Sequence, residues 1–186
     1  MLAPRDIPVT PPAAGLAARL AAAIPVLRTS RCTLRGPRLA DFDVLQAIMG
    51  GPRGAQAGGP LEPGECWADF CQATAVWLLR GHGMWTVEHA GAVAGFVLIG
   101  TEPGDREHEL GFLFDAAAEG RGLAHEAAAA ARDHAWSALR LPSLVSYVTV
   151  GNVRSEALAR RLGAAPDGTL IGDVAVWRHP RPEVAA

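Results

Sequence analysis

Hydrophobic and polar positions along this chain follow two periods, one typical of helices and the other of strands. Apolar residues recur every three to four positions in four segments, which predict helices over 41–49, 65–79, 122–139 and 152–162. Runs rich in β-branched and aromatic residues predict strands over 26–34, 84–89, 92–100, 109–114 and 144–150, with one or two more over 169–177. The order of these segments predicts a mixed α/β domain with a βαβ unit over 109–150.

Glycine and proline mark where the predicted elements end. Ala90-Gly91 predicts a tight turn that joins two strands as a hairpin. The segment 50–65 holds six glycines and three prolines, which predict a long loop of the kind that is often functional. Asp41 and Asn152 precede predicted helices and are candidate N-caps.

The two ends of the chain differ in composition from the middle. Residues 1–24 are proline-rich and then briefly helical in pattern, so we expect an N-terminal extension. A single domain over 25–180 and a tail over 181–186 complete the predicted organisation, which suits a chain of 186 residues.

Composition and charge narrow the classes of function. With 49% hydrophobic residues and a formal net charge of −2, the chain predicts a globular protein that binds neither nucleic acid nor a membrane surface through a broad basic face. The three cysteines, Cys32, Cys66 and Cys71, show no disulfide framework. No apolar run is long enough to span a membrane and no signal peptide is visible, so we expect a cytoplasmic location.

A glycine-rich turn between the strand at 109–114 and the next helix predicts a phosphate site, because backbone N–H groups and the helix dipole converge there. Two familiar phosphate-binding motifs do not fit. A P-loop needs a lysine, and the chain has none. A Rossmann fingerprint needs a third glycine where His125 stands. A flavin- or nucleotide-dependent enzyme therefore remains only as a rival interpretation.

The same turn, Glu119-Gly120-Arg121-Gly122-Leu123-Ala124, resembles the [QR]-x-x-G-x-[GA] loop of the GNAT superfamily of N-acetyltransferases at Gly122 and Ala124. The resemblance extends over about residues 26–178, and within the superfamily the chain is similar to the ribosomal-protein-alanine N-acetyltransferase-like branch. The segments that carry it, in chain order, are Cys32-Thr33-Leu34-Arg35, Leu39-Ala40-Asp41-Phe42-Asp43, His108 to Phe114, Glu126-Ala127, Asn152-Val153-Arg154-Ser155 and Arg161-Leu162-Gly163-Ala164.

This resemblance implies a fold and an activity. The fold is a mixed, largely antiparallel sheet of six or seven strands, with a splay between two central parallel strands and helices on both faces. The activity is transfer of an acetyl group from acetyl-CoA, as co-substrate, to a primary amine of a protein N-terminus, an amino acid or a small amine. Transfer is direct, in a ternary complex, and the protein is a monomer or homodimer. The alternative is a module that binds acyl-CoA without transferring it.

The resemblance also implies roles for particular residues. The backbone of Phe112, Leu113 and Phe114 would pair with pantetheine, and Glu119, Gly120, Arg121, Gly122, Leu123 and Ala124 would hold the pyrophosphate. Asn152 would reach the pantetheine amides and Ser155 the sulfur, where its hydroxyl is a candidate proton donor. Glu109 is the candidate general base, because a carboxylate beside the splay can take the proton of an ammonium group.

Each of these assignments has a plainer alternative. Glu107 and Glu109 could both line a solvated sheet face, and Asn152 could be a helix cap alone. Glu119 is an acid beside a phosphate site, and it must point away or pair with Arg121 to be tolerated. Ala159 stands where many GNAT members carry a tyrosine that protonates the leaving thiolate. Cys66, Cys71 and His82 lack the spacing of a zinc site, so we expect no metal.

Overall fold

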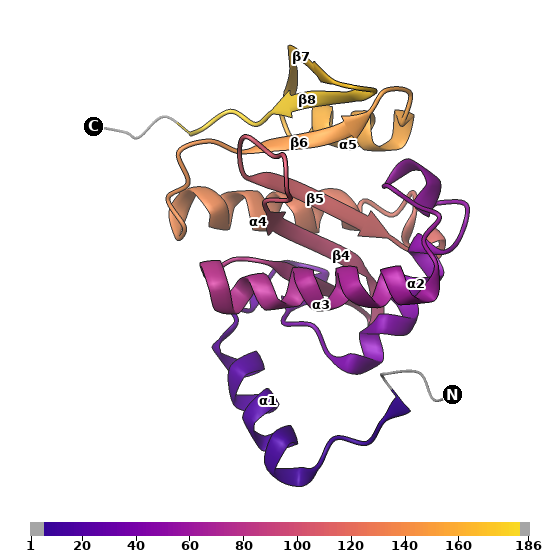
Figure 1. The fold of residues 1–186 in the computed structure, drawn as a ribbon. Coiled ribbons are helices and arrows are strands. Elements are labelled where there is room, and N and C mark those ends of the chain that lie inside the picture. Colours follow the sequence, from indigo (N-terminus) through magenta and orange to yellow (C-terminus); the bar gives the residue numbers. More distant parts are fainter. Residues whose placement is uncertain (1–5, 183–186) are drawn as a thin grey trace.

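Eight strands form one sheet through the centre of the molecule, in the order β1-β2-β3-β4-β5-β6-β8-β7 (Figure 1). This computed structural model describes residues 6–182. Residues 1–5 of the expected extension and 183–186 of the expected tail lie outside the described part. All neighbouring strands are antiparallel except β5 and β6, which are parallel. The predicted mixed, largely antiparallel α/β sheet is therefore confirmed, with one strand more than the six or seven expected.

The strands are β1 (Leu27–Arg28), β2 (Cys32–Arg35), β3 (Met84–His89), β4 (Ala92–Gly100), β5 (Glu109–Phe114), β6 (Val145–Thr149), β7 (Ala165–Ile171) and β8 (Val174–Arg178). The helices are α1 (Pro11–Ala23), α2 (Phe42–Met49), α3 (Pro63–Arg80), α4 (Leu123–Ser137) and α5 (Val153–Arg161). Short 3-10 turns lie at Leu39–Asp41, Gly54–Gln56 and Ala116–Ala118. The hairpin β3–β4 and the strand β5 have the bounds that the sequence predicts.

The single strand predicted over 26–34 is wrong. The chain reverses at Thr29, whose N–H donates to the Cys32 carbonyl at 2.9 Å and whose Oγ1 accepts from the Cys32 N–H at 2.8 Å. A hairpin of β1 and β2 results, with Leu27 opposite Leu34. A threonine that bonds both backbone groups of a residue three positions on replaces the usual glycine turn, so neither Gly nor Pro marked the reversal.

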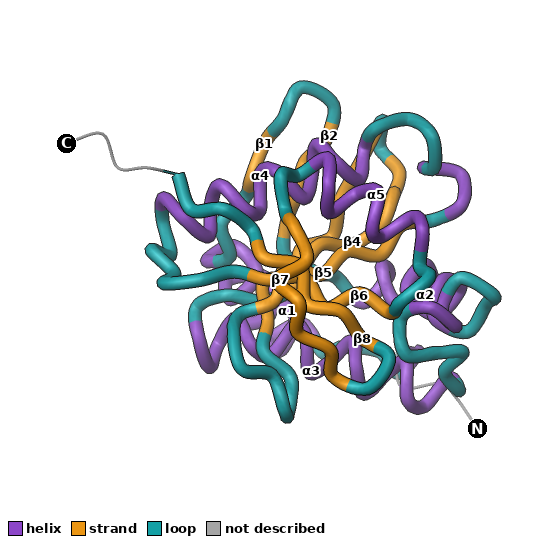
Figure 2. The backbone as a smooth tube through the Cα atoms, turned by 90° about the horizontal axis from the view of Figure 1, so that it is seen from above, coloured by secondary structure: helices purple, strands orange, loops and turns teal. Residues whose placement is uncertain are grey.

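Helices cover both faces of the sheet (Figure 2). On one face α4 packs so closely that Ala127, Ala128, Ala131 and Ala135 have no exposed surface. On the other face α2 and α3 bury Phe42, Phe70 and their neighbours against Met84 and Phe96. None of the described helices is long and apolar enough to cross a membrane.

The helix α1 lies outside these layers, at the end of the molecule where the chain begins (Figure 1). It has no buried residue, and Leu16 and Leu20 are exposed. Ile24, directly after it, packs against the main core. The assignment of residues 1–24 to an extension stays a prediction.

A buried ion pair ties β2 to the start of α2. Arg35 donates to both carboxylate oxygens of Asp41, at 2.7 and 2.9 Å, and Asp41 also accepts from the Arg38 N–H and from Thr86 Oγ1. Burial alone would raise the pKa of Asp41, but these bonds lower it below its ordinary value. Asp41 occupies the N-cap position of α2, as the sequence predicts, but its carboxylate makes no capping bond to that helix.

We predict that Asp41→Asn lowers the free energy of unfolding by about 2 kcal/mol, because the buried Arg35 guanidinium loses its bidentate carboxylate and keeps the Glu88 carboxylate, which bonds to its Nε. Chemical denaturation at pH 7 measures the loss. The control is Asp133→Asn, which breaks an exposed ion pair with Arg132 and should cost less than about 1 kcal/mol. Equal effects of the two substitutions would contradict this account of the Arg35–Asp41 pair.

Candidate active site

The sheet opens where its two parallel strands meet. Of β5 and β6, only Glu109 and Val145 are paired, and the Val145 N–H donates to the His108 carbonyl at 3.0 Å. Next along the strands, the Leu110 carbonyl accepts from Ser146 Oγ at 2.7 Å instead of from a backbone N–H. Beyond this point the ladder stops, and the strands separate toward their C-terminal ends. The expected splay is present.

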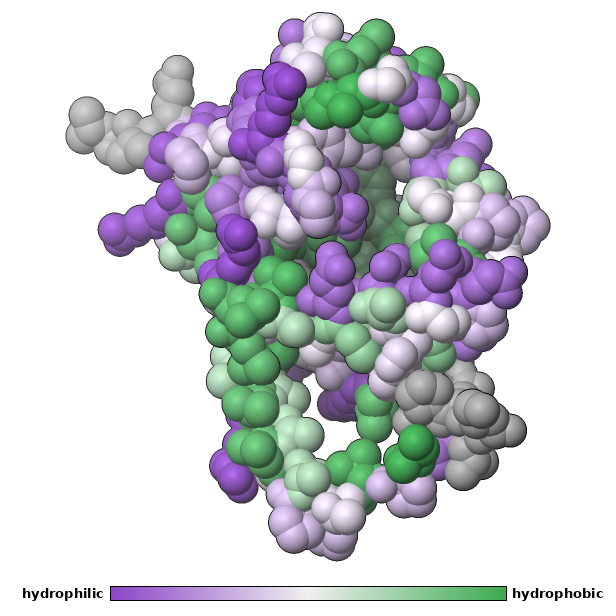
Figure 3. All heavy atoms as spheres, in the orientation of Figure 1, coloured by the Kyte–Doolittle hydropathy of each residue, from purple (hydrophilic) through white to green (hydrophobic). Residues whose placement is uncertain are grey.

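The opening between β5 and β6 forms a cavity of about 490 Å³. Its walls come from β4, β5, β6, α3 and the loop after β4, and its lining includes Phe112, Leu113, Asn152 and Ser155. Figure 3 shows the hollow, with hydrophobic residues on its floor and hydrophilic residues along the α3 side. Phe114 instead packs against the main core.

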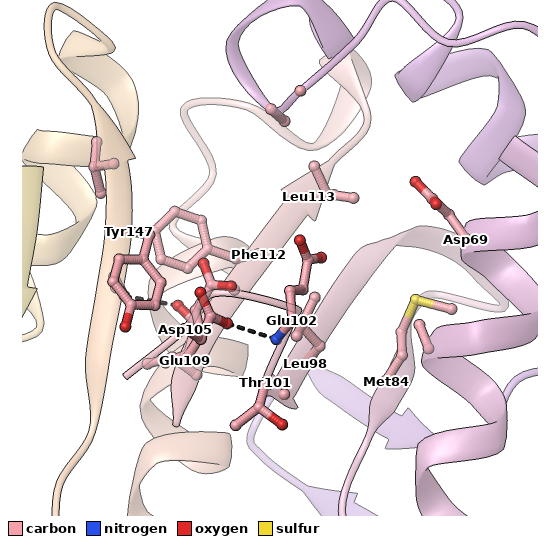
Figure 4. A pocket seen from close by; sticks show the side chains of 18 of the residues that line it. Asp69, Met84, Leu98, Thr101, Glu102, Asp105, Glu109, Phe112, Leu113 and Tyr147 are labelled. Carbon is pink, nitrogen blue, oxygen red and sulfur yellow. Dashed lines mark hydrogen bonds between the residues drawn. The ribbon is translucent and has the colours of Figure 1, made fainter. Parts of the chain in front are cut away.

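Four carboxylates line this cavity and no lysine, arginine or histidine does, among the residues that the structure describes. They come from three elements, and Figure 4 shows three of them near Tyr147 and Asp69 across the cavity on α3: Glu102, Asp105, Glu109 and Asp69. Asp105 accepts from the Glu102 N–H at 2.6 Å, which orders the loop between β4 and β5. The sequence pattern did not reveal this group, because its members are up to 40 residues apart and only the fold collects them.

Glu109 occupies the point where the ladder ends. Burial raises the pKa of its carboxyl to about 8, the charges of Glu102 and Asp105 act in the same direction, and a backbone bond from Tyr147 opposes them. A general base with a pKa near the working pH is efficient, because it is both available as the anion and able to hold a proton. Glu109 is partly buried and lines the cavity, which favours a role in the site over a place on a solvated strand face.

The two residues before Glu109, which are Glu107 and His108, make different contacts. Glu107 lies before β5 and not on it, and its two carboxylate oxygens each accept from Arg178 at 2.7 Å. These bonds lower the pKa of Glu107 to about 2, so it is an ion-pair partner. The His108 ring packs edge-on against His82, with 5.2 Å between ring centres.

The loop before α4 has the backbone geometry of an anion site. Gly120 and Gly122 have φ of +70° and +74°, a left-handed conformation that other residues rarely adopt. Alternation of left- and right-handed residues points successive N–H groups to one side. The N–H groups of residues 120–124 donate to no other group in the described part of the chain. The Leu123 side chain is buried in the core, so that residue offers only its backbone.

Arginines from distant segments gather around this loop. Glu119 pairs with Arg53 at 2.9 Å and with Arg154 at 3.5 Å, and not with Arg121 as the sequence suggested. The Arg53 bond is the main cause of the lowered pKa of Glu119. Arg121 instead donates to His89 Nε2 at 2.8 Å. Glu119 therefore holds two arginines beside the free N–H groups.

Asn152 is both buried and fully engaged. Its Oδ1 accepts from the Ser155 N–H at 3.2 Å, so it caps α5, and its Nδ2 donates to the Gln56 carbonyl at 3.2 Å. The half-buried Ser155 lines the cavity one turn before Ala159, which is completely buried against Val148 and Trp177. No group of three or more His, Cys, Asp or Glu side chains in residues 6–182 is arranged to hold a metal ion.

The splayed parallel pair opens beside a glycine loop at a helix N-terminus, an arrangement that can hold an extended molecule with an anionic end. The family described as "Acetyltransferase (GNAT) domain" matches residues 31–165, and the chain belongs to this family of acetyltransferases.

Solved structures of acetyltransferases have a similar fold over most of this chain. An acetyltransferase from Agrobacterium tumefaciens strain C58 is 40% identical, with a TM-score of 0.81 over 84% of this chain and 95% of that one. A putative ribosomal-protein-serine acetyltransferase from Vibrio cholerae is 20% identical, with a TM-score of 0.65 over 84% and 97% of the two chains. The spermidine N-acetyltransferase of Vibrio cholerae, in complex with CoA and spermine, is 19% identical, with a TM-score of 0.66 over 81% and 94%.

The raised pKa of Glu109 predicts a pH-dependent cost to stability. The folded protein favours the neutral form of this carboxyl more than the unfolded chain does. The stability that the neutral Glu109 carboxyl contributes is therefore fully present below about pH 4.5 and is lost as the pH rises through about 8. Relative to wild type, Glu109→Gln should therefore become progressively more stable between pH 5 and pH 8, as measured by denaturation at each pH. A stability difference that does not change with pH would contradict the environment assigned to Glu109.

Proposed function

We propose that this protein transfers the acetyl group of acetyl-CoA to a primary amine, directly and within one ternary complex. The observation that carries the proposal is the junction of two features: the strand pairing stops after Glu109–Val145, and the same strand β5 leads into a loop whose N–H groups have no acceptor among residues 6–182. The first feature offers a slot for an extended arm and the second a site for the phosphates attached to it.

The donor would lie along the opened edge of β5. Backbone groups of Phe112 and Phe114, on the side of β5 that has lost β6, would pair with the amides of pantetheine, as another strand would. The Leu113 backbone faces β4, where Leu113 lies opposite Phe96, so the expectation that it also pairs with pantetheine is wrong. The pyrophosphate would accept from the N–H groups at Gly120 to Ala124, with Arg53, Arg121 and Arg154 near enough to add charge. Since Asn152 is engaged with Gln56 and Ser155, we assign it the role of shaping this wall.

The acceptor would enter from the acidic side of the cavity. An amine is an ammonium ion at neutral pH, so the carboxylates of Asp69, Glu102 and Asp105, with no cationic side chain among the described residues of the lining, favour it over a neutral alcohol or an anion. The spermidine N-acetyltransferase has the same fold with spermine bound, which shows that the fold accommodates a polycationic amine. Protein N-termini and amino acids remain within the proposed class.

The chemistry needs three steps. Glu109, as the carboxylate, takes a proton from the ammonium, directly or through water, and frees the nitrogen lone pair. The nitrogen attacks the thioester carbonyl carbon, and the C–S bond breaks as the amide forms. The departing thiolate then takes up a proton, and the second proton of the nitrogen, released as the amide forms, restores the group that supplied it. Ala159 is buried and cannot supply it, so Ser155, which lines the cavity on the same helix, is the proposed donor to the sulfur.

The glycine loop can be tested with Gly122→Val. A side chain there is incompatible with φ of +74°, and its Cβ would lie 3.3 Å from Arg31 Nη2. We expect the affinity for CoA, measured by calorimetry, to fall at least about tenfold. The control is Gly168→Val, which has the same left-handed strain (φ of +88°) with no atom within 4 Å and lies in β7, away from the loop. Equal CoA affinity in both variants would refute the phosphate assignment.

The base can be tested through the pH dependence of kcat/KM, followed as CoA release with a panel of amines. Wild type should gain activity as the pH rises toward about 8, because Glu109 becomes the carboxylate over that range. Glu109→Gln should lose about 100-fold at pH 7 and less at pH 9, where more of the free amine is present. A protein that binds acetyl-CoA tightly but acetylates no amine at any pH would favour the alternative of a binding module.

A further inference from the structure

The turn of the β1–β2 hairpin reaches over the phosphate loop. Three consecutive residues of this turn, Thr29, Ser30 and Arg31, all bond to Glu126 in the first turn of α4, more than 90 residues away. Arg31 also touches the loop itself, through Arg121. The binding of acetyl-CoA and of the amine, as proposed above, involves none of these contacts.

Glu126 anchors Arg31. Its carboxylate accepts from the hydroxyls of Thr29 and Ser30, and from both the backbone N–H and the Nε of Arg31, each at 2.7 Å. Burial alone would raise the pKa of Glu126, but these bonds outweigh it and lower the pKa to about 2. Glu126 is therefore an anion, and it holds Arg31 through both the backbone N–H and the side chain.

Arg31 in turn fixes one peptide unit of the loop. Its Nη1 donates to the Arg121 carbonyl at 2.7 Å. A trans peptide is planar, with its C=O and N–H pointing in opposite directions. Holding the Arg121 carbonyl toward Arg31 therefore turns the Gly122 N–H away from Arg31, to the side where none of the described residues accepts it.

His89 closes the ring of contacts. Its Nδ1 lies 2.9 Å from the Arg31 carbonyl, which can only accept, so Nδ1 carries the proton. Nε2 is then an acceptor and receives the Arg121 Nη2 donor at 2.8 Å. The backbone and the side chain of Arg121 are thus both held by groups outside the loop.

We propose that Arg31 and Glu126 are positioning residues for the CoA donor: Arg31 sets the Gly122 N–H toward the pyrophosphate, and Glu126 holds Arg31 in place. This role rests on the proposed function. It also explains why an acidic residue is tolerated so close to a phosphate site, since Glu126 acts through the guanidinium that neutralises it.

The test compares Arg31→Met and Glu126→Gln with wild type by calorimetry with CoA and by kinetics. Arg31→Met should weaken CoA binding about tenfold, since the Arg121 carbonyl loses the guanidinium that orients it, and should raise the KM for acetyl-CoA by the same factor. The kcat at saturating acetyl-CoA and the KM for the amine should stay unchanged. Arg28→Met is the matched control, because Arg28 lies on the same hairpin and contacts only Thr33 among the hydrogen bonds of the described chain.

Glu126→Gln separates positioning from simple electrostatics, and it is close enough in shape to serve if Arg31→Met does not fold. Removing a negative charge near the phosphates should tighten CoA binding if charge alone matters, whereas loosening Arg31 should weaken it. We expect weaker binding, by several-fold.

A second donor, S-acetylpantetheine, lacks the pyrophosphate and distinguishes positioning from general damage. Both variants should use it as well as wild type does. The proposal is overturned if Glu126→Gln binds CoA as tightly as wild type or more tightly, or if activity falls equally with both donors. If wild type binds no CoA, the proposed function fails and this role fails with it; if wild type binds CoA and Arg31→Met binds it equally, only this role fails.

Discussion

The site depends on one interruption in an otherwise continuous sheet. β5 pairs with β4 along its whole length but with β6 at a single residue pair, so the strands must part. Ser146 Oγ satisfies the Leu110 carbonyl where the ladder ends, and His179 Nε2, 3.0 Å from Ser146 Oγ, supports that hydroxyl from behind. A sheet that ended this ladder without a substitute donor would leave a buried carbonyl unpaired, which is costly.

Positively and negatively charged side chains lie on opposite sides of the opening between β5 and β6. Arginines from the turn after β1, the loop after α2, the phosphate loop and α5 gather where an anion would bind, while carboxylates from α3, β5 and the loop before it line the opposite side. The formal net charge of −2 conceals this separation. A donor rich in phosphate and an acceptor that carries an ammonium group would each meet the complementary field, and the reacting atoms would meet at Glu109.

Rigid contacts from far along the chain support the glycine loop. Glycines permit the left-handed backbone but do not select the direction of each N–H. The contact between Arg31 and the Arg121 carbonyl sets the direction of the Gly122 N–H. Glu126 and His89 in turn bond to Arg31 and hold it in place. The β1–β2 hairpin therefore has a function as well as a place at the edge of the sheet.

The sequence by itself determined the order of elements, the hairpin β3–β4, the strand β5 and the glycine loop before α4, because periodicity and turn residues are local properties. It also indicated Glu109, through a resemblance that the family match confirms at the level of the fold. Only the tertiary structure decided the partners. The pairing of Glu107 with Arg178, of Glu119 with Arg53 and Arg154, and of Glu126 with Arg31 joins residues 35 to 95 positions apart. The same holds for the acidic cavity: which charged groups meet depends on how the sheet twists and where the loops fold back, and neither leaves a local pattern in the chain.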